Sequence, residues 1–193
     1  MSKISNVLLL FSLFLLVSCG PNPSKLSQDA EGFAKLQEVF VDKFGADAYY
    51  TNISIVFVPG KSAGSGLMFN VVETTDPSSH KMQEWAYNSH SGWQNTAEVT
   101  LEIEGDTDPK EFMFQLDDTF NLRKVGELIE KSSKKLAEEK NITNAVLNTA
   151  WMDAPDNGDF STMKIAITMK PENGGTTFNF YYTLDGELED FTY

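Results

Sequence analysis

The chain has 193 residues, of which 41% are hydrophobic and 12% aromatic, and its formal net charge is −13. A chain of this length buries about two-thirds of its unfolded surface, so it needs no disulfide, and its single cysteine offers none. The excess of carboxylates argues against nucleic acid as a partner and against electrostatic docking on anionic lipid, because both require clustered Lys and Arg. It is compatible with cationic or basic-protein partners and with solubility alone.

The chain opens with a short apolar segment. Residues 7–17 are hydrophobic except for Ser12, and Lys3 precedes them. This run is too short for a stable transmembrane helix. A basic residue followed by a short apolar run is typical of a secretory signal peptide, here residues 1–18. We therefore expect the rest of the chain to work outside the cytoplasm.

The segment ends in Leu16-Val17-Ser18-Cys19, which resembles the lipobox of bacterial lipoproteins. The resemblance implies that Cys19 becomes the first mature residue, with diacylglycerol on its thiol and an acyl chain such as palmitate on its amino group. Each buried methylene contributes roughly 0.8 kcal/mol, so several chains make membrane attachment effectively permanent. The alternative is ordinary secretion with a stray thiol at Cys19.

The residues after Cys19 predict a location and a tether. Gly20, and not aspartate, follows the cysteine, which in the enterobacterial sorting pattern implies transfer to the outer membrane, on its periplasmic face or at the cell surface. Pro21 and Pro23 lack backbone donors and have few apolar neighbours, so residues 19–28 are expected to form an extended tether.

A first unit is predicted over residues 29–117. Apolar side chains recur every three or four residues from Phe33 to Phe44, which predicts a helix over residues 29–44 that Gly45 ends. Alternating patterns separated by turns then predict five strands, of which the first four form an antiparallel meander. The expected strands are residues 49–58, 67–74, 81–88, 93–103 and 112–116.

A second unit is predicted over residues 118–193. An amphipathic helix over residues 121–140, capped by Asn121, precedes four more strands. The expected strands are residues 142–152, 162–170, 176–183 and 187–192. The repeated order suggests a duplication, with residues 52–54 aligned on 141–143. A second register, which aligns Phe112 with Phe180, stays open.

A helix that precedes an antiparallel meander buries its apolar stripe by lying across one face of the sheet. The sequence therefore predicts an α+β protein made of two helix-plus-four-strand units, a tandem α-β4 arrangement with the helices on one sheet face. This element order resembles the β-lactamase inhibitor protein family and the small PepSY-like periplasmic domains. The resemblance implies binding, and not catalysis, by analogy of fold.

The chemistry-bearing residues do not assemble into a catalytic motif. His80 and His90 lie in turn-like segments, and Ser65 between two glycines lacks the G-x-S-x-G spacing of a nucleophile elbow. Zinc would need clustered His and Cys, and neither clusters here. We therefore expect no enzymatic activity and no cofactor or metal.

Two alternatives remain open. The loop at residues 153–159 gathers oxygen ligands of the kind that calcium prefers, although its spacing differs from an EF-hand, and Pro155 and Gly158 already explain it as a turn. An envelope hydrolase could instead use loop carboxylates, and this hypothesis requires a cleft in which a Glu or Asp has a raised pKa.

Aromatic side chains in the strands are the candidates for a binding surface, namely Trp85, Tyr87, Trp93 and Tyr181. Trp85 and Tyr87 share one face of their strand, and most such side chains must fill the core. We expect the remainder, Tyr181 and Trp93, to form a patch on the sheet face that the helices leave open. The partner predicted for this patch is a protein or peptide of the cell envelope.

Overall fold

The computed structural model describes residues 22–62, 64–103 and 105–193. Cys19 and the rest of the predicted lipobox lie outside these residues. The helices are α1 (Ala30–Phe44) and α2 (Leu122–Lys140). The strands are β1 (Tyr49–Val58), β2 (Gly66–Thr74), β3 (Lys81–Asn88), β4 (Gly92–Thr100), β5 (Ala145–Asp153), β6 (Lys164–Pro171), β7 (Phe178–Thr183) and β8 (Leu188–Thr192).

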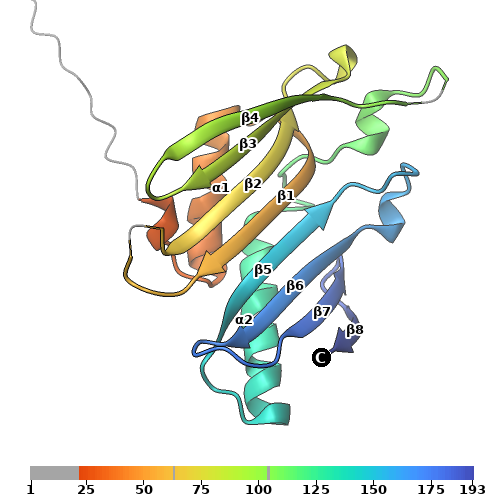
Figure 1. The fold of residues 1–193 in the computed structure, drawn as a ribbon. Coiled ribbons are helices and arrows are strands. Elements are labelled where there is room, and N and C mark those ends of the chain that lie inside the picture. Colours follow the sequence, from red (N-terminus) through yellow and green to blue (C-terminus); the bar gives the residue numbers. More distant parts are fainter. Residues whose placement is uncertain (1–21, 63, 104) are drawn as a thin grey trace, which may run out of the picture.

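The eight strands form one antiparallel sheet in the order β4-β3-β2-β1-β5-β6-β7-β8. The predicted α+β class is therefore confirmed. The central pair is β1 with β5, in which Ile53 lies opposite Met152 and Ser54 opposite Trp151. Both helices lie side by side behind this sheet, and its other face is open (Figure 1).

Local sequence explains where both helices begin and end. The Asp29 carboxylate accepts a hydrogen bond from the Gly32 amide at 2.8 Å, and Asn121 does the same for Lys124 at 3.0 Å. These side chains satisfy amides that have no partner within the first helical turn. Gly45 ends α1 at a φ of 94°, a conformation that glycine adopts without a steric penalty. Both helices were predicted from the sequence, and both are confirmed.

The two helices touch through their backbones. A Cβ at Gly126 of α2 would stand 2.4 Å from the Asp29 carbonyl oxygen and 2.7 Å from the Cα of Ala30. Only glycine permits so close an approach. The Leu122 amide also donates to the Gln37 side chain at 2.8 Å, so the first turn of α2 is fixed against α1.

A single cluster of buried apolar residues lies between the helix layer and the sheet, and it includes residues of both halves of the chain. Two polar side chains buried beside this cluster are paired with each other. Ser132 of α2 donates to the Leu128 carbonyl at 2.8 Å, and its oxygen lies 2.8 Å from the Tyr182 hydroxyl of β7. This pairing lets a serine and a tyrosine share a dry interface without an unsatisfied group.

The fifth strand predicted for the first unit, residues 112–116, is wrong. The segment begins as a 3-10 helix, η3 (Pro109–Phe112), because Pro109 has no amide to donate and Asp108 caps the Lys110 amide at 3.0 Å. After it, Phe114 makes only a single bridge to Tyr50. The Phe114 ring stacks on the Tyr50 ring, with 5.9 Å between their centroids. The apolar residues of this segment therefore pack in the core and do not pair as a strand of the sheet.

The extended tether is also wrong for residues 22–28. Pro23–Lys25 form a 3-10 helix, η1, in which Ser24 is only 5% exposed. Gln28 accepts a hydrogen bond from the Leu147 amide at 2.7 Å. The folded body therefore includes the chain from Asn22 onward.

The alignment of residues 52–54 with 141–143 fails in the structure. Asn52 lies inside β1, whereas Asn141 caps α2 in the left-handed conformation at a φ of 56°. β5 begins only at Ala145, later than predicted. Within the described ranges, no helix combines the length and the apolar character needed to cross a membrane.

Leu128 and Lys134 test the packing of α2. Leu128 is 4% exposed, whereas Lys134 is exposed, so Leu128→Ala should lower the free energy of unfolding by about 2–5 kcal/mol. Lys134→Ala should change it by less than about 0.5 kcal/mol. Urea melts of the chain from Gly20 onward measure both, and equal effects would contradict this packing.

Candidate functional site

The sheet face opposite the helices carries two exposed aromatic side chains. Trp151 of β5 is 50% exposed and Tyr181 of β7 is 38% exposed. Both lie opposite Ala166 of the strand between them. Adjacent strands are about 4.8 Å apart, so roughly 10 Å separates the two aromatic positions. The small side chain of Ala166 leaves room between their rings.

A cleft of about 800 Å³ opens beside this pair at one end of the sheet. Trp151, Ala166 and Tyr181 belong to its wall, together with residues of β1, the β5–β6 connection and the segment after β4. The other lining residues are Thr51, Asn52, Leu101, Asp153, Ala154, Pro155, Asp156, Asn157, Thr162, Met163 and Lys164. The cleft is therefore assembled from four parts of the chain that are distant in sequence.

The cleft has an acidic wall. Asp153 and Asp156 contribute carboxylates, and the Asn52 amide group donates to Asp153. Lys164 also lines the cleft, but its ammonium is paired with Glu189. The two carboxylates thus give the cleft a negative potential beside its aromatic surface.

Local hydrogen bonds order the acidic loop. The Asn157 side chain accepts from the Asp159 amide at 3.0 Å, and Asp159 accepts from the Ser161 amide at 3.0 Å. These are turn-forming interactions of Asn and Asp. In the described part of the chain, no three His, Cys, Asp or Glu side chains are grouped so that they could hold a metal ion.

The structure places three of the four predicted surface aromatics on the helix side of the sheet. The Trp93 ring lies 5.8 Å from Phe40 and 5.1 Å from Phe44 of α1, so the expectation that Trp93 joins Tyr181 on the open face is wrong. Tyr87 and Trp85 also pack against the core. The structure brings these three together, and it leaves Tyr181 apart from them.

Trp151 was missed by sequence reasoning. It lies between the buried residues Ala150 and Met152, and strand alternation places it on the opposite face. That alternation was the available signal. Tyr181, which was predicted as a surface residue, lies on this face with Trp151.

The other residues considered for catalysis lie outside the cleft lining. His80 caps a 3-10 helix, η2 (Pro77–Ser79), at a φ of 57°, and His90 is exposed in the β3–β4 turn. The Ser65 hydroxyl donates to the Ser62 carbonyl at 2.7 Å within the β1–β2 loop. All three therefore lie in turns or loops away from the cleft.

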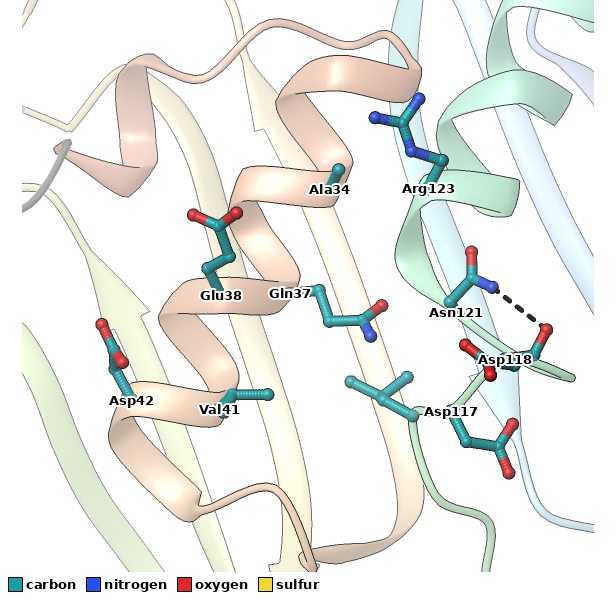
Figure 2. A pocket seen from close by; sticks show the side chains of 10 residues that line it. Ala34, Gln37, Glu38, Val41, Asp42, Asp117, Asp118, Asn121 and Arg123 are labelled. Atoms are coloured by element: carbon teal, nitrogen blue, oxygen red, sulfur yellow. Dashed lines mark hydrogen bonds between the residues drawn. The ribbon is translucent and has the colours of Figure 1, made fainter.

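A second cavity, of about 520 Å³, lies between α1 and the segment that leads into α2 (Figure 2). Its polar groups already hold local structure. Asp117 accepts from the amides of Thr119 and Phe120 at 2.7 and 2.9 Å. Arg123 lies at the opposite end of the cavity from Asp117 in Figure 2 and pairs with Glu31 at 3.4 Å. We therefore consider the open sheet face the better candidate.

Glu73 is a buried carboxyl group on the helix side of the sheet, 6% exposed. Burial raises its pKa, while a 2.9 Å hydrogen bond from the Trp85 indole and the nearby Lys43 ammonium act in the opposite direction. The Lys43 ammonium also lies 3.8 Å from the centre of the Trp85 ring. The group belongs to the core and not to the cleft.

Comparison with protein-family models, with curated proteins and with solved structures gives no match. The candidate site on the open face is defined by the exposure and strand pairing of Trp151 and Tyr181 and by the residues that line the cleft.

Replacing Glu73 by Gln tests its buried charge. A raised pKa means that the folded state binds the proton more tightly than the unfolded state, so the contribution of Glu73 is most favourable below its ordinary pKa and is lost as pH rises through the raised value. Relative to wild type, Glu73→Gln should gain stability between pH 4 and pH 7 and keep an acceptor for Trp85. Urea melts at both pH values measure this, and a pH-independent difference would contradict it.

Proposed function

We propose that this chain is a lipid-anchored, extracytoplasmic lipoprotein that binds a protein or peptide of the cell envelope and is not an enzyme. The lipobox ending in Cys19 supports the anchor, and Gly20 after it supports the outer membrane, on its periplasmic face or at the cell surface. Attachment is through lipid alone, because several acyl chains suffice for stable anchoring.

The observation that carries the binding role is the pair of exposed aromatics that flanks Ala166 on the open sheet face. Trp and Tyr supply large contact area with little loss of side-chain freedom, and they are enriched at binding hot spots. The partner's basic side chains would complement Asp153 and Asp156. The same charge disfavours nucleic acid.

We further propose that the fold is a tandem of α-β4 units. Each half of the chain supplies one helix followed by four strands. The four strands of the first half form one half of the sheet, and those of the second half form the other. The resemblance to the β-lactamase inhibitor protein family and to PepSY-like domains rests on this element order. It supports binding by analogy of fold alone.

A second candidate function is hydrolysis of envelope polysaccharide or peptide by carboxylates of the cleft. The presence of Asp153 and Asp156 in the cleft wall favours it. The raised pKa that such catalysis requires belongs to Glu73, which lies outside that wall. Turnover in a substrate screen, abolished by Asp153→Asn or Asp156→Asn, would establish this function in place of binding.

The binding role predicts cross-linking from the open face. A photo-crosslinking amino acid at position 181 should give a discrete product in cells that make the protein, and the same group at Lys134, exposed on α2, should not. Trp151→Ala should reduce that product about tenfold or more, because loss of an aromatic anchor costs about 2 kcal/mol. Equal products from both positions, or no effect of Trp151→Ala, would contradict the proposal.

The anchor makes a separate prediction. Wild type should take up labelled palmitate and sediment with membranes, whereas Cys19→Ala should do neither, because the thiol is the attachment point. Fractionation of cells that express each form measures this. If Cys19→Ala still sediments with membranes and wild type takes up no labelled palmitate, lipidation is refuted.

A further inference from the structure

The first described residues, 22–25, pack against one end of β2 and β3. Ser24 is buried, and its carbonyl oxygen would stand 2.1 Å from a Cβ on Gly66, the first residue of β2. The Tyr87 hydroxyl of β3 donates to the Asn22 side chain at 3.4 Å. Figure 1 shows this segment at the same end of the sheet as the β1–β2 connection, with the β5–β6 connection at the opposite end. We call the first of these ends the tether end.

The chain between the predicted lipid attachment and the fold is short. Only two residues separate Cys19 from Asn22, so three Cα steps of about 3.8 Å limit their distance to about 11 Å. A lipid-bearing Cys19 held at the bilayer surface thus keeps Asn22, at the tether end, within about that distance. It leaves no room for a second layer of protein between them.

We propose that the tether end of the sheet faces the lipid headgroups, and that the aromatic cleft therefore points away from the membrane. This orientation rests on the proposed lipid anchor. The surface concerned consists of η1, residues 59–62 and 64–65 between β1 and β2, and residues 89–91 between β3 and β4. Its partner is a bilayer surface, and not a protein.

The charge at this end fits a phospholipid surface. Although the chain has 28 Asp and Glu residues, none lies in residues 22–28, 54–70 or 86–94, which form this end of the first half of the sheet. Lys25 and Lys61 are exposed there. Two lysines near an anionic surface give a weak attraction, which orients the fold but does not anchor it. A carboxylate here would be repelled by the same surface.

The carboxylates nearest this corner have partners, and those farther along the same end belong to the second half of the chain, where Glu138 and Glu139 of α2 pair with Lys134 and Lys135. Asp29 is engaged as the cap of α1, and Glu31 pairs with Lys35 at 3.2 Å and with Arg123. In the second half of the sheet, Glu172 follows β6. The acid-free corner is thus the one from which the tether emerges.

The cleft lies at the other end of the strands. Phe57 of β1 lines a cavity at the tether end, together with Asn22 and Lys25. Asn52 of the same strand lines the cleft. Five residues of antiparallel strand span about 17 Å, so Asn52 stands up to that much farther from the bilayer than Phe57. A membrane-bound protein of this orientation offers the cleft to partners outside the lipid layer.

Two exposed serines provide a matched test. Ser62 lies in the β1–β2 loop at the tether end, and Ser161 lies in the β5–β6 connection at the opposite end. Because the only native cysteine is the lipidated one, Ser62→Cys or Ser161→Cys accepts a single nitroxide label. The lipidated, labelled chain is reconstituted into phospholipid vesicles that contain a lipid with a chelated paramagnetic headgroup.

We expect strong relaxation enhancement of the label at position 62 and a value close to that in solution at position 161. Insertion of ten Gly and Ser residues after Gly20 should abolish the difference. Equal enhancement at both sites, with the protein still sedimenting with the vesicles, would overturn the orientation and leave the anchor intact. Failure to incorporate lipid or to sediment would overturn the anchor, and the orientation with it.

Discussion

The pairing of β1 with β5 is the interaction on which the rest of the structure depends. Five residue pairs, from Asn52 with Asp153 to Val56 with Thr149, join the two halves of the chain into one sheet. Without this seam each half would present a long, unpaired strand edge, which proteins normally avoid. On the helix side of the sheet, the buried residues Ile53 and Met152 lie opposite each other across the seam and join the core. On the other side, the seam is part of the open face, where Ser54 lies opposite Trp151.

The helix layer reinforces this seam from behind. Gly126 allows α2 to lie directly on the backbone at the start of α1, so the helices cross at a fixed point. Each helix packs on its own half of the sheet, and their contact links the halves a second time. The functional surface is thus presented by a continuous, double-layered scaffold, as an extended binding surface requires.

Sequence periodicity predicted the helices and most strand boundaries because each element buries one face. It could not predict the end of the tether, since Gln28 is fixed by Leu147, which lies 119 residues away. It also failed for Phe112 to Leu116, where buried apolar residues pack as an irregular segment. Apolar character alone does not distinguish a strand from an irregular segment that packs in the core.

The candidate site was predictable only in part. Tyr181 follows from alternation, and Trp151 would have followed from the same argument. The face of Trp93 was not predicted, because it depends on the register of the β3–β4 hairpin, in which Asn88 lies opposite Gly92 and Tyr87 opposite Trp93. The cleft itself depends on contacts among four distant segments, so its existence required the three-dimensional structure.

Amide hydrogen exchange along the seam tests the central claim most directly. If one sheet unites the two halves, the backbone amides that join β1 to β5 should exchange only through global unfolding, more slowly than those of the edge strands β4 and β8. The slowest amides of both halves should then share one free energy of opening. Exchange at the seam as fast as at the edges, or two separate opening energies for the two halves, would contradict the account.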